Sequence, residues 1–335
     1  MSVIYRWIHR VWYEDAPSGL ILLPLSGLYW LMLNLKELLY RHQILSARRA
    51  EVPVIVVGNI TTGGTGKTPT VIWLVNELRD KGYTPGIVSR GYGRRKSNSP
   101  IKVNKNSNVS VVGDEPILLA KRGGCPVAVD TNRARAVSVL IDDGVDVIVA
   151  DDGLQHLQLE RDFEICVIDG SRGLGNLRLI PSGPLREMPR RLRSVDQVLI
   201  NGEGSFRDSI SFKLLASDAN RLNGTLSQPL QAFRGKTVHA IAGIGNPARF
   251  FELLRSYDIQ IIEHNFPDHA ELTYEEINFD DQFEVLMTEK DAVKFSKKLP
   301  DKFWFIPVDL NMNSTMSSDL IKRIEMRLKS YGEKQ

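Results

Sequence analysis

A run of eight residues near the start of the chain has the composition of a phosphate-binding loop. In order it reads Thr61, Thr62, Gly63, Gly64, Thr65, Gly66, Lys67 and Thr68. Glycines let successive backbone N–H groups point at phosphate oxygens, and the N-terminus of a following helix adds partial positive charge. We expect Lys67 to reach the β- and γ-phosphates and the Thr68 hydroxyl to ligate magnesium. The run therefore predicts binding of ATP with Mg2+, in a variant motif because Thr61 replaces the usual first glycine.

A second segment has the pattern of a strand that delivers a carboxylate to such a loop. Four apolar residues, 147–150, run directly into Asp151 and Asp152. A buried strand with this ending places an acid beside the phosphates, where it holds magnesium directly or through water. The pattern leaves open which of the two aspartates touches the metal.

Other classes of phosphate-loop protein fit the sequence less well. A GTPase needs an Asn-Lys-x-Asp motif, and 288–291 has a different order. Membrane-organising ATPases carry a lysine at the position of Thr62. A kinase would need a base near the acceptor hydroxyl and cations around the transferring phosphate.

The bulk composition is that of a globular protein large enough for two cores. The chain has 335 residues, of which 42% are hydrophobic and 25% charged, with a formal net charge of +3. So mild a balance gives no indication of nucleic-acid binding. The two cysteines, Cys125 and Cys166, form no CxxC pair, so neither a zinc knuckle nor a disulfide framework is indicated.

The N-terminal region contains a long uncharged segment. Residues 16–35 carry no charge and are strongly apolar, although Pro24 interrupts them. About 20 residues just span a bilayer, so a membrane-spanning helix, an interfacial helix and a buried core helix all remain open. Trp7, Trp12 and Trp30 suit the headgroup level, and the arginines that follow the segment favour a cytoplasmic C-terminal side.

The remaining pattern predicts an α/β fold, in which a P-loop NTPase-like parallel sheet is flanked by helices and a second, smaller α/β unit follows. We expect an apolar, membrane-associating helix in 1–50, a kinase core in 51–202, a connector in 203–235 and the smaller unit in 236–335. The segments that read as strands are 52–57, 85–89, 126–129, 145–150, 163–168, 197–200, 239–242, 259–263, 283–287 and 303–308.

Several ordered blocks resemble the tetraacyldisaccharide 4'-kinase family. The resemblance runs from the N-terminal apolar segment to about residue 294. The blocks are 58–69, 89–94, 112–116, 151–156, 181–187, 243–250 and 266–269. It implies a kinase that phosphorylates the 4'-hydroxyl of a tetraacylated glucosamine disaccharide 1-phosphate, forming lipid IVA on the route to lipid A. It also implies work at the cytoplasmic face of the bacterial inner membrane, with the acylated lipid and the membrane surface as partners.

The resemblance also suggests roles for single residues. It makes Asp114 the base that accepts the hydroxyl proton, with His269 assisting after closure of the two units over ATP. Arg186 would contact the substrate phosphate, and Glu115 would serve the metal or the loop. His156 is a candidate for a supporting position, and the task of 288–291 stays open. The basic clusters 90–96 and 186–193 either meet anionic groups or form solvated faces.

Two other functions compete with the lipid kinase. A membrane-associated P-loop ATPase would drive assembly or transport without a lipid acceptor, and a noncatalytic module would only sense nucleotide. The complete set of Lys67, Thr68, Asp151 and Asp152 argues against the noncatalytic module. No nucleic acid and no obligate protein partner is indicated.

Overall fold

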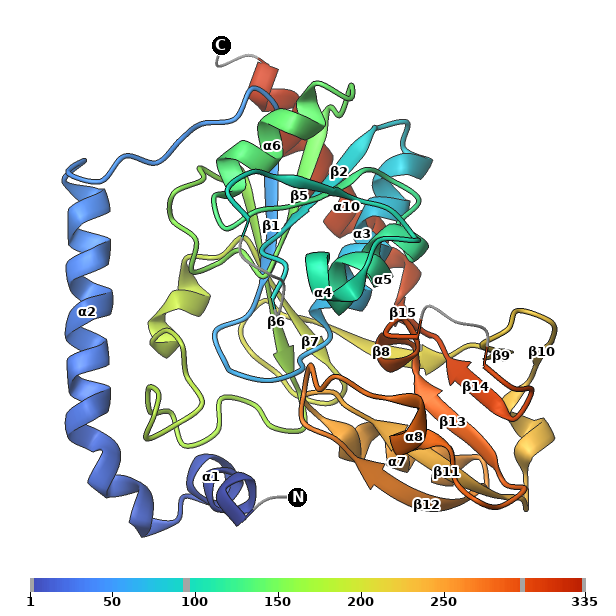
Figure 1. The fold of residues 1–335 in the computed structure, drawn as a ribbon. Coiled ribbons are helices and arrows are strands. Elements are labelled where there is room, and N and C mark those ends of the chain that lie inside the picture. Colours follow the sequence, from blue (N-terminus) through green and yellow to red (C-terminus); the bar gives the residue numbers. More distant parts are fainter. Residues whose placement is uncertain (1–2, 93–96, 296–298, 333–335) are drawn as a thin grey trace.

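The chain folds around two separate β-sheets (Figure 1), as seen in a computed structural model. The model describes residues 3–92, 97–295 and 299–332. The predicted basic residues Arg94, Arg95 and Lys96 lie outside the described residues.

The larger sheet has nine strands in the order β15-β8-β7-β6-β1-β5-β2-β4-β3. The six central pairings, from β8 across to β4, are parallel, and the two edge strands β3 and β15 are antiparallel to their neighbours. The strands are β1 (Val54–Gly58), β2 (Pro85–Ser89), β3 (Ile101–Val103), β4 (Val127–Val129), β5 (Val147–Asp151), β6 (Phe163–Asp169), β7 (Gln197–Asn201), β8 (Ile210–Ala216) and β15 (Val308–Met312). The predicted parallel sheet of a P-loop fold is confirmed.

Helices cover both faces of this sheet, so its central strands are buried on both sides. One face packs against α3 (Lys67–Asp80), α5 (Asp114–Arg122) and α10 (Ser314–Gly332). The other face packs against α6 (Arg133–Ile141) and the loops around Leu179. Burial of these β-branched strands is the main stabilising term, and it fixes where each strand ends.

The smaller sheet has six strands in the order β10-β9-β14-β13-β11-β12. The strands are β9 (Ala219–Arg221), β10 (Ser227–Gln228), β11 (Thr237–Ala242), β12 (Gln260–Asn265), β13 (Glu284–Thr288) and β14 (Phe303–Ile306). Its helices are α7 (Pro247–Ser256), α8 (Tyr274–Ile277) and the short α9 (Glu289–Ala292). The four strands β12, β11, β13 and β14 are parallel, so their carboxyl ends share one edge.

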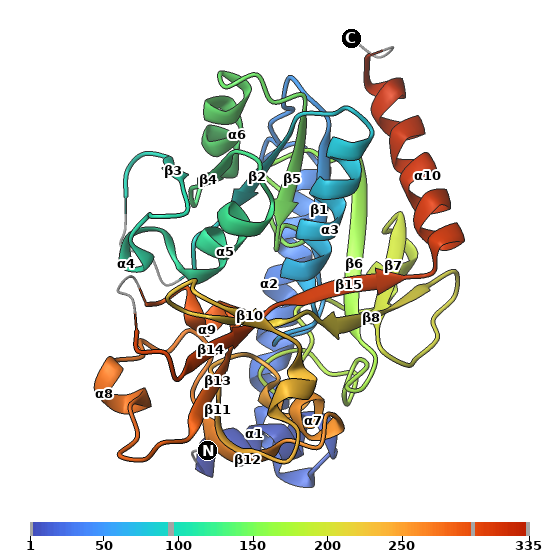
Figure 2. The same ribbon diagram turned by 90° about the vertical axis from the view of Figure 1, so that its right-hand side faces the viewer.

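The observed boundary between the two units differs from the expected one. Residues 203–235, expected as a connector, contribute β8 to the larger sheet and β9 and β10 to the smaller one. The end of the chain returns from the smaller unit, because β15 pairs with β8 and α10 packs on the core of the larger sheet. The chain therefore crosses between the sheets twice (Figure 2). Residues of β8 alternate in burial, and the exposed ones include polar side chains. The local sequence therefore gave no indication that β8 pairs with β15.

The loops expected over 90–108 contain β3, and α5 follows them. The helix expected from Asn132 begins one residue later, with Asn132 rather than Thr131 at the capping position and without a side-chain capping bond. The other predicted strands appear within two residues of their expected bounds, as is normal for element ends.

The N-terminal segment forms α1 (Val3–Tyr13), a 3-10 turn (Pro17–Leu22) and α2 (Leu23–Arg41). Figure 1 shows α2 standing along one side of the molecule, with α1 across its lower end. The segment Pro17–Arg41 is long and apolar enough to cross a membrane, and 11% of its most apolar window is buried. The buried-core interpretation of this segment is therefore contradicted.

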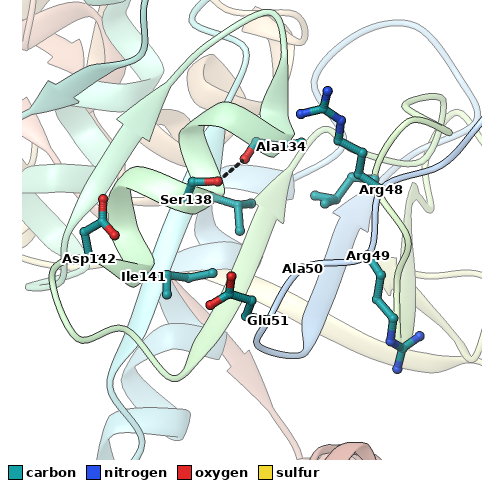
Figure 3. Close-up of a pocket in the computed structure, with 10 residues that line it drawn as sticks. Arg48, Arg49, Ala50, Glu51, Ala134, Ser138, Ile141 and Asp142 are labelled. Atoms are coloured by element: carbon teal, nitrogen blue, oxygen red, sulfur yellow. Dashed lines mark hydrogen bonds between the residues drawn. The ribbon is translucent and has the colours of Figure 1, made fainter. Parts of the chain in front are cut away.

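A cavity of about 260 Å³ opens between the segment after α2 and helix α6 (Figure 3). Arg48, Glu51, Ser138 and Asp142 are among the side chains that line it. These residues precede β1 and β5, so the cavity lies at the amino edge of the sheet. The phosphate loop lies at the opposite, carboxyl edge, and the cavity is no part of that site.

The packing of α10 on the larger sheet can be tested with one matched pair of variants. We predict that Ile324→Ala, at a fully buried position, lowers the free energy of unfolding by about 3 kcal/mol. Met326→Ala, 63% exposed on the same helix, should change it by less than about 0.5 kcal/mol. Urea denaturation followed by circular dichroism measures both, and equal effects would contradict the docking of α10.

Candidate active site

The predicted phosphate loop links the end of β1 to the start of α3. Gly63 and Gly66 have φ angles of 98° and 102°, which a residue with a side chain adopts only with strain. Gly66 occupies the position before the first turn of α3, so Lys67 and Thr68 lie in that turn. The loop thus has the strand–loop–helix geometry that the sequence predicts.

The first two residues of the loop make backbone contacts with a neighbouring segment of the chain. Thr61 forms a β-bridge with Leu185, and the Thr62 amide donates to the Pro184 carbonyl at 2.8 Å. The segment 181–187 therefore runs beside the loop and ties down its start. The Thr62 amide, expected to face phosphate, is already occupied in this structure.

The far side of the loop rests on both sheets. Asn201, at the end of β7, donates from Nδ2 to the Thr65 carbonyl at 3.1 Å. Gly245, in the turn before α7, lies so close that a Cβ there would come within 2.3 Å of the Gly64 nitrogen. A side chain at Gly245 would therefore displace the loop, which explains a glycine at this place in the turn.

The two aspartates after β5 have different surroundings. Asp151 is buried and accepts one hydrogen bond from the Ser89 hydroxyl at 3.3 Å, and no side chain or backbone group in the described part of the chain contacts its Oδ1 atom by a hydrogen bond. Burial raises the pKa of Asp151, and the charges of Glu115 and Asp152 raise it further. A cation at this position would relieve that repulsion.

Asp152 is held by two cations. Its carboxylate accepts from Arg186 Nη1 at 3.0 Å and lies 3.5 Å from Lys67 Nζ. Burial alone would raise the pKa of Asp152, but Lys67 and Arg186 bring it well below the ordinary value. Arg186, expected at a substrate phosphate, thus contacts the acid pair in this structure.

Asp114 and His269 meet at the boundary between the two sheets. Asp114 begins α5, and His269 lies in the loop after β12, 155 residues further along the chain. Nδ1 of His269 is 2.9 Å from one carboxylate oxygen of Asp114 and 3.1 Å from the other. Asp114 is 4% exposed and His269 has a φ of 60°, a left-handed conformation that histidine adopts more readily than most residues.

The contact changes the proton affinity of both groups. Burial would raise the pKa of Asp114, but the hydrogen bond to His269 and the charge of Lys290 bring it below its ordinary value. Burial would lower the pKa of His269, but the hydrogen bond to Asp114 gives a net increase. Asp114 is therefore a carboxylate at neutral pH and is able to accept a proton.

Glu115, a candidate metal or loop residue, faces a lysine of the smaller unit. Lys290 Nζ lies 2.9 Å from Glu115 Oε1, 3.0 Å from Asp268 Oδ1 and 3.4 Å from His269 Nε2. Burial would lower the pKa of Lys290, but Glu115 and Asp268 raise it above its ordinary value. The two units are thus already in contact here, where closure was expected to bring them together.

Three residues around the loop were missed by the sequence reasoning. Arg133, 3% exposed, donates to the Asp152 carbonyl at 3.1 Å. Arg172 donates to the Gly245 carbonyl at 2.9 Å and lies beside Gly63. Gln155 bridges the Asn59 carbonyl and Glu187 at 2.9 Å and 2.6 Å. Only Gln155 lay within a recognised block, and nothing local distinguishes the other two from surface arginines.

Several predicted basic residues serve the protein itself. Arg191 pairs with Glu164 at 2.5 Å and with Glu187 at 3.2 Å, and Arg190 lies 3.8 Å from Glu37 of α2. His156 is partly buried, and its Nε2 atom has no hydrogen-bond partner within 3–92, 97–295 and 299–332. Burial, with the charges of Arg133 and Lys36, lowers the pKa of His156 to about 4.

The residues present fit a nucleotide with a divalent cation. The buried hydroxyls of Thr62 and Thr65 and the Asp151 Oδ1 atom have no hydrogen-bond partner among the residues that the structure describes, although buried polar atoms normally have one. These atoms lie in or beside the glycine loop, together with the charged Lys67. Hydroxyl and carboxylate oxygens are the ligands that magnesium prefers.

The parallel sheet, the loop after β1 and the acid pair after β5 together define a P-loop nucleotide-binding protein.

Comparison with known proteins narrows this class. Residues 18–325 match the model of the tetraacyldisaccharide-1-P 4'-kinase family. A tetraacyldisaccharide 4'-kinase of Nitrosococcus oceani is 43% identical over 330 residues, which cover 98% of this chain and 97% of that one. One of Methylobacillus flagellatus is 43% identical over 322 residues, covering 95% and 96%. A crystal structure of LpxK from Aquifex aeolicus in complex with ATP is similar with a TM-score of 0.76 and 27% identity, covering 92% and 99%.

The chain therefore belongs to the tetraacyldisaccharide 4'-kinase family, as the sequence blocks predicted. The expectation of an ATP-dependent lipid kinase is confirmed, and the ATPase alternative is not favoured.

The lowered pKa of His156 predicts that the free energy of unfolding depends on pH. Its pKa is about 4 when folded and 6.5 ordinarily, so the unfolded chain binds more protons between these values. The stability that neutral His156 contributes above pH 6.5 is then lost as the pH falls toward 4. The free energy of unfolding falls by at most about 1.4 kcal/mol per pH unit.

We predict that wild type loses about 1 kcal/mol more than His156→Gln between pH 7.5 and 5.5, measured by urea denaturation. His42→Gln, at an exposed position, serves as the control and should follow wild type. The same pH dependence in all three proteins would contradict this assignment.

Proposed function

We propose that this chain transfers the γ-phosphate of ATP to the 4'-hydroxyl of a tetraacyldisaccharide 1-phosphate, forming lipid IVA in lipid A biosynthesis. The observation that carries the proposal is the Asp114–His269 pair, a carboxylate with a histidine partner at the boundary of the two sheets. The charge of Glu115, next to Asp114, contributes to the raised pKa of Asp151, which supports a position of this pair near the acid pair. Family membership supports the same acceptor.

The loop residues would hold the nucleotide by its phosphates. Backbone N–H groups of 63–68 and the Lys67 ammonium would bind the β- and γ-phosphates. Lys67 would then leave Asp152, whose carboxylate lies 3.5 Å from the ammonium nitrogen in this structure. Thr68 and Asp151 are the oxygen ligands we assign to magnesium, because Asp151 has an oxygen with no partner among the described residues and Asp152 is held by cations. Bound magnesium would neutralise charge on the phosphates during transfer.

Asp114 would act on the acceptor. It is ionised, buried and held by His269, so it is able to take the proton from the sugar hydroxyl as that oxygen attacks phosphorus. His269 fixes the carboxylate in place and stabilises its charge. Arg186, partly exposed beside Asp152, is the residue we assign to substrate phosphate.

We predict that Asp114→Asn lowers the rate of transfer by about 10²–10⁴, while the dissociation constant for Mg-ATP changes less than about threefold. Labelled γ-phosphate is followed into the extractable glycolipid, with the purified disaccharide 1-phosphate in detergent micelles. Lys67→Ala should lose both nucleotide affinity and transfer. No label in the lipid with wild type would reject the lipid acceptor and restore the ATPase alternative.

The position of α2 supports an interfacial helix and not one that crosses the bilayer. Along its length it is tied to the kinase core: the Ser26 hydroxyl donates to the Leu179 carbonyl, Tyr29 to that of Arg186 and Lys36 to that of Gln155. A crossing helix would carry these loops into the hydrocarbon, where their backbone groups would lack partners.

We therefore propose that α2 lies on the cytoplasmic face of the inner membrane with its opposite side in lipid. The exposed apolar residues of that helix are Leu23, Leu25, Leu28, Trp30, Leu31, Met32, Leu35 and Leu38. The arrangement places the kinase core next to a substrate that its four acyl chains keep in the bilayer.

We predict that Leu28→Glu with Leu31→Glu, at positions 57% and 56% exposed, reduces binding to anionic phospholipid vesicles by more than about tenfold. The reason is the loss of two leucine side chains from the apolar interface. Vesicle cosedimentation measures the effect, with Met326→Glu on α10 as the control. Unchanged binding of the α2 variant would contradict the proposed orientation.

A further inference from the structure

Lys290 lies at the point where the two units meet. Its ammonium is close to three groups: Glu115 of α5, Asp268 and the Nε2 atom of His269, at 2.9, 3.0 and 3.4 Å. The lysine side chain is 14% exposed. None of the roles derived above for loop, acids or base requires it.

The neighbours of Lys290 hold its backbone rigidly. Asp291 is fully buried and accepts hydrogen bonds from the Gly243 amide at 2.9 Å and the Thr288 hydroxyl at 2.6 Å. It also pairs with Lys294 at 2.8 Å. Thr288 in turn accepts from the Asp291 amide at the start of α9. The short helix is thus anchored to the smaller sheet, and Lys290 projects from it toward α5.

A hydrogen bond between Lys290 and His269 has only one possible direction. An ammonium group has three donors and no acceptor, so a hydrogen bond with Nε2, 3.4 Å away, forms only when that nitrogen carries a lone pair. The ring proton is then on Nδ1, the atom that faces Asp114 at 2.9 Å. The same contact opposes rotation of the ring, because a flipped imidazole would turn a carbon toward the carboxylate.

We propose that Lys290 is a positioning residue for phosphate transfer, which holds His269 in the tautomer and orientation that donate to Asp114. The inference rests on the proposed function of the Asp114–His269 pair. Lys290 touches neither nucleotide nor acceptor in this account; it acts through His269. Asp268 and Glu115 in turn fix the ammonium by charge-assisted hydrogen bonds.

A purely structural role of Lys290 would give a different result on substitution. Helix α9 makes a second ion pair with α5, between Glu289 and Arg122 at 2.7 Å, which also joins the units but does not touch His269. If Lys290 only docked the two units, loss of either pair would have the same kind of effect. If it orients His269, its effect should disappear once His269 is removed.

The test is a kinetic cycle with the full chain in detergent micelles, using Mg-ATP and the disaccharide 1-phosphate. We expect Lys290→Met to lower kcat by about 10–100-fold, with the KM for ATP changed less than about threefold. In a His269→Ala background the same substitution should change kcat by less than about threefold. Glu289→Gln, the matched control on the same helix, should retain kcat within about twofold.

Lys290→Gln keeps a donor without the charge and should have an intermediate kcat; it carries the test if Lys290→Met is poorly folded by circular dichroism. The inference is overturned if kcat is unaffected, or if it falls by the same factor with and without His269. Absence of lipid phosphorylation by wild type in this assay would instead reject the proposed function itself.

Discussion

The contact between Asp114 and His269 is the interaction on which the active-site geometry depends. One partner begins a helix on the larger sheet and the other follows a strand of the smaller sheet, so the pair exists only when the two are docked. Docking is in turn fixed by the chain crossing between the sheets twice, through β8 and β9 and again through β14 and β15. The fold therefore holds a buried carboxylate at the junction of the two sheets, a place that no single sheet would supply.

The same docking shapes the phosphate loop. Asn201 of the larger sheet and Gly245 of the smaller unit both contact it, and Arg172 links Gly245 to the larger sheet. Movement of one unit relative to the other would therefore change the loop and the base together. Because α2 is tied to the loops 154–192 on the same core, this arrangement also connects the surface proposed to face lipid to the candidate site.

The features that the sequence predicted are those whose residues lie next to one another in the chain. Lys67, Thr68 and the loop glycines adjoin one another, and the central strands are short apolar runs, so local pattern was sufficient. The pairing of Asp114 with His269 came from family blocks and not from spacing. Arg133, Arg172 and Lys290 acquire their partners only through tertiary contacts, and β15 is an edge strand that pairs with β8, more than ninety residues away. Their local sequence carries no such information.

The most direct test of this account is a double-mutant cycle on the single-turnover rate of phosphate transfer to the disaccharide lipid. Asp114→Ala, His269→Ala and the double variant would be compared with wild type at saturating Mg-ATP. The proposal that the two residues act as one unit predicts that the double variant is no slower than Asp114→Ala within about threefold. Rate losses that multiply in the double variant would show that the two residues act independently and would contradict the account.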